Sequence, residues 1–64
     1  MTSYTPQIID ILRRNGFEYW RSGKDDHQIW RHKVTGKRVT VDSKVLSRHN
    51  ANKTLRDAGL PKAF

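Results

Sequence analysis

The sequence predicts a small α+β domain with the element order α-β-β-β-α, in which two helices lie on one face of a three-stranded antiparallel sheet. Apolar residues recur at helical spacing near both ends of the chain. Between them lie three short segments rich in aromatic and β-branched residues, which favour strands. Short separators that each contain a glycine join these segments, as is typical of antiparallel neighbours.

The first helix is predicted over roughly residues 5–15. Thr5 is the expected N-cap and Pro6 the first helical residue, because threonine can accept a hydrogen bond from an unpaired amide and proline has no amide to leave unpaired. Isoleucine and leucine side chains between positions 8 and 12 form an apolar stripe. Gly16 is expected to end this helix in a left-handed conformation.

The three strands are predicted at Phe17–Arg21, Gln28–Arg31 and Arg38–Val41. Alternation along the third strand places its two valines on one face and its other two residues on the opposite face, so one side of the sheet is packed and the other is solvated. Trp20 and Trp30 are expected in the core, where the tryptophans of small domains usually lie. The alternative is that they stack on unpaired bases from an open sheet face.

The segment after the third strand has no clear period and is predicted to form a loop, with Val45 or Leu46 turned inward. A second helix is expected to begin near Asn50 and to end at Gly59. Its inner face is predicted from three apolar residues at helical spacing, Ala51, Leu55 and Ala58. The apolar residues that follow are expected to fold back onto the core as a C-terminal tail.

Length and composition limit the classes of function. The chain has 64 residues and no cysteine, so it is expected to form one domain, residues 1–64, held together by apolar packing alone. Multi-domain enzymes and deep cofactor pockets are excluded. No apolar run approaches the roughly 20 residues that cross a bilayer, and the first residues lack the features of a signal peptide, so a cytoplasmic protein is expected.

The positive charge is unevenly distributed. Lysine and arginine number 13 against 6 aspartates and glutamates, a formal net charge of +7, and the excess begins only after residue 20. Such an excess favours a nucleic-acid partner, whose phosphates release counterions when cations neutralise them. An anionic membrane is the weaker alternative, because no segment combines a long basic helix with a broad apolar face. The residues expected to hold RNA phosphates are Arg21, Lys24, Arg31, Lys33, Lys37 and Arg38.

Histidines are the side chains best suited to acid–base chemistry near neutral pH, and His27 is the strongest candidate because it opens the second strand directly after a hairpin loop. His32 lies five residues further on, so strand alternation points it to the opposite face. Asp25, Asp26 and His27 can in principle hold a divalent ion. Neighbouring strand residues point to opposite faces, however, so we expect no metal site and no cofactor.

Several segments of the sequence resemble the HicA (YcfA-like) toxin family, and the resemblance covers nearly the whole chain. They are Gly16-Phe17, Gly23-Lys24, His27-Gln-Ile-Trp-Arg-His32, Gly36-Lys-Arg-Val-Thr-Val41 and Leu55-Arg-Asp-Ala-Gly-Leu60. Family members are small ribonucleases with the fold of double-stranded RNA-binding domains, a layout that the predicted element order also matches. The resemblance implies metal-independent cleavage of mRNA with little sequence preference, a single essential histidine that corresponds to His27, and neutralisation by a HicB-type antitoxin.

A single histidine can remove the proton of a ribose 2′-hydroxyl, whose oxygen then attacks the adjacent phosphate while cations stabilise the developing charge. Lys24 and Arg31 are the nearest such cations in the sequence. The chain departs from the family pattern in residues 43–49, and also at Asp25 and Asp26, which stand where the family usually has Gly-Ser or Gly-Gly. These carboxylates would either repel RNA and weaken the activity, or favour a protonated His27 that acts as an acid.

Three other functions are compatible with the sequence. The first is a double-stranded RNA-binding module without catalytic activity. The second is an inactive descendant of the family, in which the two aspartates mark the loss of cleavage. The third is a small protein-interaction module whose positive charge serves an acidic partner.

Overall fold

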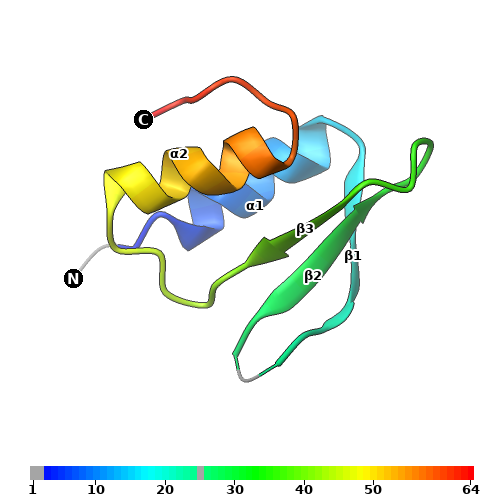
Figure 1. Ribbon diagram of the computed structural model, residues 1–64, viewed down its shortest axis with the longest axis horizontal. Coiled ribbons are helices and arrows are strands. Elements are labelled where there is room, and N and C mark those ends of the chain that lie inside the picture. Colours follow the sequence, from blue (N-terminus) through cyan, green and yellow to red (C-terminus); the bar gives the residue numbers. More distant parts are fainter. Residues whose placement is uncertain (1–2, 25) are drawn as a thin grey trace.

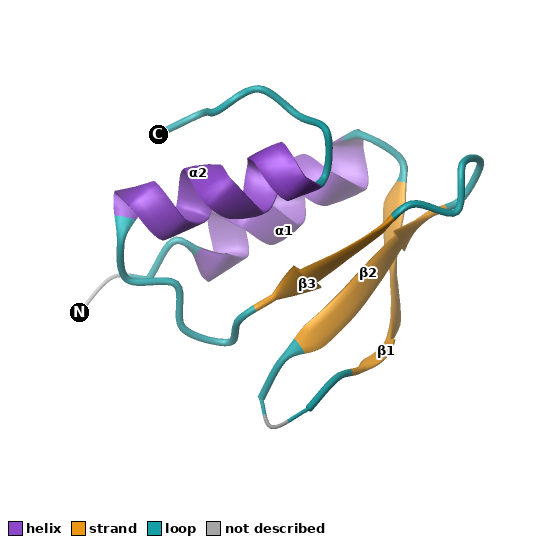
Figure 2. Ribbon diagram, in the orientation of Figure 1, coloured by secondary structure: helices purple, strands orange, loops and turns teal. Residues whose placement is uncertain are grey.

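The computed structural model describes residues 3–24 and 26–64 and confirms the predicted order of elements (Figure 1). The elements are α1 (Thr5–Arg14), β1 (Phe17–Ser22), β2 (Gln28–His32), β3 (Arg38–Val41) and α2 (Arg48–Asp57). The strands form one antiparallel sheet in the order β1-β2-β3. Both helices lie on the same side of this sheet, as predicted (Figure 2).

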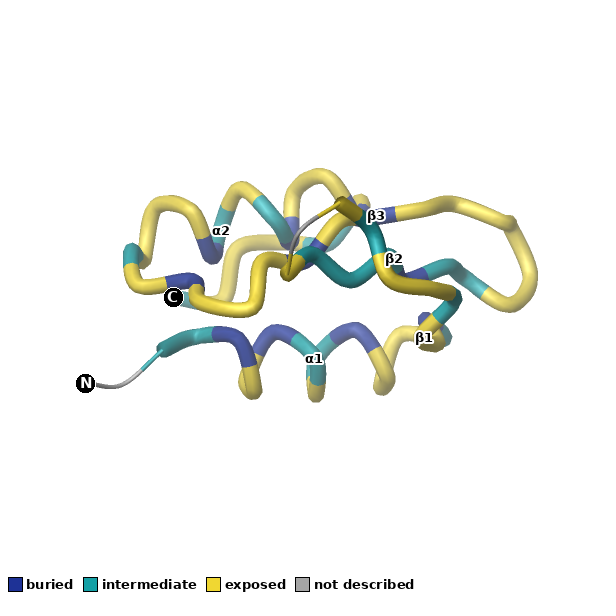
Figure 3. The backbone as a smooth tube through the Cα atoms, turned by 90° about the horizontal axis from the view of Figure 1, so that it is seen from below, coloured by how far each residue is buried: buried dark blue, intermediate teal, exposed yellow. Residues whose placement is uncertain are grey.

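One hydrophobic cluster joins the helices to the inner face of the sheet. It consists of Ile8, Leu12, Phe17, Trp30, Val39, Val41, Val45, Ala51, Leu55 and Ala58. Arg38 and Thr40 are exposed and alternate with the buried Val39 and Val41, which confirms the predicted alternation. The buried stretches of α1 face the rest of the molecule and its exposed stretches face away from it (Figure 3). Among residues 3–24 and 26–64, no helix or strand covers the outer face of the sheet (Figure 2).

The starts of both helices differ from the prediction. Tyr4, not Thr5, occupies the N-cap position of α1, and it makes no side-chain capping bond. The Thr5 hydroxyl instead donates to the carbonyl oxygen of Asp42 at 3.0 Å and accepts from the Val45 amide at 3.0 Å. Contacts with a distant loop thus replace local capping. Helix α2 begins two residues before the predicted position, with Ser47 as its N-cap.

The prediction that both tryptophans lie in the core is right for Trp30 and wrong for Trp20. Trp30 is 3% exposed, whereas Trp20 is only partly buried. The strand register pairs Tyr19 with Trp30 and Arg21 with Ile29, so Trp20 is the extra residue of a β-bulge. Its ring lies against arginines of the outer sheet face rather than in the core.

The loop and the C-terminal tail follow the predictions. Val45 is buried, whereas Leu46 is exposed, so the first of the two candidates turns inward. The tail runs back along α2 (Figure 1), and the Phe64 and Tyr4 rings pack edge-to-face with centroids 5.0 Å apart. The Asn52 side chain bonds both the amide and the carbonyl of Phe64. Within the described part of the chain, neither helix has the length and apolarity needed to span a membrane.

Candidate functional site

His27 lies immediately before β2, at the end of the loop that joins β1 to β2. The loop is closed by a hydrogen bond from the Gly23 amide to the His27 carbonyl at 2.8 Å and by one from the His27 amide to the Lys24 carbonyl at 3.2 Å. The backbone on either side of the imidazole is therefore fixed, while its side chain remains 40% exposed. This combination of a held backbone and an accessible ring suits a group that must meet a substrate.

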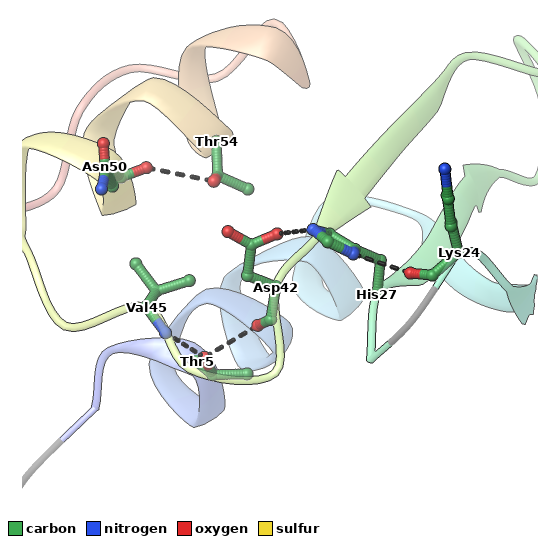
Figure 4. Close-up of polar contacts among 7 residues, drawn as sticks. All are labelled: Thr5, Lys24, His27, Asp42, Val45, Asn50 and Thr54. Carbon is green, nitrogen blue, oxygen red and sulfur yellow. Dashed lines mark hydrogen bonds and ion pairs between the residues drawn. The ribbon is translucent and has the colours of Figure 1, made fainter.

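Both ring nitrogens of His27 have partners (Figure 4). Nδ1 lies 2.8 Å from the carbonyl oxygen of Lys24, and Nε2 lies 2.5 Å from Oδ1 of Asp42. Because a carbonyl oxygen and a carboxylate can only accept, both contacts are hydrogen bonds only when both nitrogens carry a hydrogen. When both nitrogens carry a hydrogen, the ring is an imidazolium paired with the Asp42 carboxylate.

The two contacts differ in how easily a substrate can replace them. The Lys24 carbonyl belongs to the closed backbone of the loop, so it fixes Nδ1 as a donor. The Asp42 carboxylate is a side chain that is 56% exposed, and it can rotate away from the ring. Nε2 is therefore the atom of His27 that an incoming group can reach.

Asp42 is a site residue that the sequence analysis missed. It follows Val41, which pairs with Gln28, so Asp42 and His27 occupy the next positions across the two strands. Pairing the predicted strands Gln28–Arg31 and Arg38–Val41 end to end, and extending that pairing by one residue, would have identified the contact. The Thr5 hydroxyl holds the Asp42 backbone from the other side, so α1 also contributes to the site (Figure 4).

His32 has a structural role at the opposite end of β2. Its Nδ1 accepts hydrogen bonds from the Val34 and Thr35 amides at 3.1 and 3.2 Å, and its ring packs edge-on against Phe17. Gly16 has a φ of +88°, and a Cβ there would lie 2.8 Å from Nε2 of His32, so only glycine fits this position. His32 therefore orders the turn between β2 and β3 and takes no part in the His27 site.

The predicted phosphate-binding residues do not form a single surface. Arg21, Arg31 and Arg38 gather around the Trp20 ring, with guanidinium carbons 4.7, 5.2 and 4.8 Å from its centroid. Arg31 lies four residues along β2 from His27, about 13 Å at the usual rise of a strand, so it is remote from the imidazole.

The three predicted lysines lie elsewhere. Lys24 supplies a carbonyl oxygen to His27, while its side chain extends away from the imidazole (Figure 4). Lys33 and Lys37 are exposed in the turn between β2 and β3. The ammonium of Lys37 lies 3.3 Å from the place where a Cβ on Gly59 would sit, so this side chain is directed toward the end of α2. Lys24 is the predicted cation closest to His27 along the chain.

Among residues 3–24 and 26–64, no group of three histidine, aspartate or glutamate side chains comes together in a way that could hold a metal ion. Asp25 lies outside the described residues, and Asp26 is exposed. The effect of the Asp25-Asp26 pair on His27 therefore stays a prediction.

Comparison with known proteins identifies the family to which the chain belongs. Residues 6–60 match the family model described as HicA toxin of bacterial toxin-antitoxin, which covers most of the chain. The chain belongs to the HicA toxin family. No significant match was found among curated proteins or among solved structures. As a HicA toxin, the chain has the role of a toxin in a toxin–antitoxin pair, and the family implies an antitoxin partner.

Proposed function

We propose that this HicA toxin is a metal-independent endoribonuclease in which His27 moves the proton of a ribose 2′-hydroxyl. The observation that carries the proposal is the arrangement of the His27 ring, with Nδ1 fixed by the Lys24 carbonyl and Nε2 facing an exposed, replaceable carboxylate. The net charge of +7 supports RNA as the substrate class.

In the proposed reaction, the RNA displaces the Asp42 carboxylate from Nε2, and the imidazolium releases its Nε2 proton to solvent. Neutral Nε2 takes the proton of a 2′-hydroxyl, and the 2′-oxygen attacks the adjacent phosphorus. The bond to the 5′-oxygen breaks, that oxygen takes up a proton from solvent, and the other fragment ends in a 2′,3′-cyclic phosphate. The Lys24 side chain, which extends away from the imidazole in the free protein, turns toward the bound phosphate and stabilises its charge. The imidazolium formed in this way then pairs again with Asp42, which restores the starting state.

The proposed partner is a HicB-type antitoxin that covers His27, and the proposed place of action is the cytoplasm, where mRNA is translated. Family membership and the exposure of the imidazole support this part of the proposal. A domain of this size rarely gains more than about 3–5 kcal/mol from its core. A partner that binds only the folded toxin should therefore raise its melting temperature.

The test is RNA turnover by purified protein in excess chelator. His27→Ala removes a side chain outside the core, so it should leave the melting temperature and RNA binding nearly intact while lowering cleavage about 10²- to 10⁴-fold. His49→Ala, which removes an exposed histidine from the start of α2, is the matched control and should cleave like the wild type. Equal cleavage by the wild type and His27→Ala refutes the assignment. RNA binding without cleavage by either protein favours a non-catalytic RNA-binding module.

A further inference from the structure

The uncovered outer face of the sheet carries an aromatic ring surrounded by arginines. Trp20 of β1 lies at the centre, and the guanidinium carbons of Arg21, Arg31 and Arg38 lie within 5.2 Å of its ring centroid. All three strands contribute to this group. We call these four residues the tryptophan–arginine cluster.

The bulge in β1 allows the cluster to form. In a regular strand, consecutive side chains point to opposite faces, so Trp20 and Arg21 would be separated. The register instead skips Trp20, and the Arg21 guanidinium lies 4.7 Å from the neighbouring indole. Bulges commonly redirect side chains next to functional sites.

The charge of the cluster is not neutralised within the described part of the chain. The ion pairs in the described part of the chain join Arg14 to Asp10 and His27 to Asp42, and neither pair includes an arginine of the cluster. Glu18 is the register partner of Arg31, yet no ion pair joins them. Contact with the indole face offsets only part of the repulsion among three guanidinium groups. Their N–H donors suit a ligand with several anionic oxygens.

We propose that the tryptophan–arginine cluster binds unpaired RNA, with a base stacked on the layer of indole and guanidinium groups and with phosphates held by the arginines. This inference rests on the proposed function and names the form of its substrate. Bases within an A-form duplex are covered by their neighbours, so only an unpaired base offers a face to a protein side chain. An aromatic ring combined with several cations is the arrangement that single-stranded nucleic acid favours.

The cluster and His27 share one face of the sheet. A Cβ built on Gly23 would lie 3.4 Å from the Cβ of His27 and 3.3 Å from Cγ1 of Ile29, so these two side chains point to the same side. Arg31 follows Ile29 on that side by strand alternation. With about 13 Å between His27 and Arg31 along β2, an RNA strand held by the cluster reaches Nε2 within a few nucleotides.

The experiment measures the affinity of the full chain for an unstructured RNA oligonucleotide and for the duplex of the same sequence, in a His27→Ala background that prevents cleavage. Trp20→Leu should weaken single-strand binding by about 5- to 150-fold, the range expected for loss of one base stack, and leave duplex binding unchanged. Trp20→Phe should restore most of the affinity, because it keeps an aromatic ring. Tyr19→Leu is the matched control, since this partly exposed ring faces Trp30 on the other side of the sheet.

Arg38→Gln provides a second variant that does not depend on how well Trp20→Leu folds. It should lower the salt dependence of single-strand binding by about 0.7 in logarithmic slope, the value for one lost phosphate contact. Unchanged single-strand affinity in folded Trp20→Leu, or an equal loss for single strand and duplex, overturns the proposal. It is also overturned if these variants lose binding to the antitoxin but not to RNA, which would make the face a protein-binding surface.

The proposed function can fail independently. Cleavage that depends on His27 but not on Trp20 supports the endoribonuclease activity and refutes RNA binding by the cluster. Selective binding of unpaired RNA through Trp20, with no cleavage by the wild type, supports the cluster as an RNA-binding site and refutes the proposed endoribonuclease activity.

Discussion

Replacement of Asp42 by alanine tests whether its carboxylate masks the reactive nitrogen of His27. Both side chains of this ion pair are substantially exposed, at 40% and 56%. Exposed pairs contribute about 0.2–1 kcal/mol, which corresponds to a ratio of masked to open imidazole of about 1.4 to 5. If only the open form accepts a proton from RNA, removal of the carboxylate should raise the cleavage rate about 2- to 6-fold.

The assay is the initial rate of cleavage of a fluorescent single-stranded RNA at low substrate concentration and fixed ionic strength. Asp10→Ala is the matched control, because it removes one carboxylate from another exposed ion pair, with Arg14 on α1. A general effect of charge on RNA binding would raise both rates equally. If Asp42→Ala stays folded and cleaves no faster than the wild type, then Asp42 does not mask Nε2.

Three further predictions concern residues outside the His27–Asp42 contact. Thr5→Val should lower the free energy of unfolding by roughly 2–4 kcal/mol in urea titrations, because it leaves a buried amide and a carbonyl without partners; Thr5→Ser keeps the hydroxyl and should lose much less. His32→Ala should lower the free energy of unfolding by about 1–2 kcal/mol while cleavage per folded molecule stays unchanged, and a specific loss of rate would contradict its structural role. Lys37→Ala should reduce the salt dependence of RNA binding less than Arg38→Ala does, because Lys37 is directed toward α2; equal effects would place both on one RNA-binding surface.

Local patterns in the sequence were sufficient to predict the elements and the inner face of the sheet. The alternation of Val39 and Val41 with polar residues identified the buried side of β3, because side chains of a strand alternate whatever the rest of the chain does. Gly16 and Gly59 marked the ends of the two helices, and both have the positive φ that glycine adopts without strain. The position of His27 after a hairpin loop identified the candidate site for a similarly local reason.

Tertiary structure decided which partners these residues have. Asp42 reaches His27 because two strands lie side by side. The Thr5 hydroxyl bonds a loop 37 residues away instead of capping α1. Trp20 lies outside the core because it is the extra residue of a β-bulge in β1, which shifts the register. The arginines around its ring come from three strands. Periodicity along the chain specifies which face a residue prefers. The partner on that face depends on register and on the packing of distant segments, which form only when the whole sheet and both helices are in place.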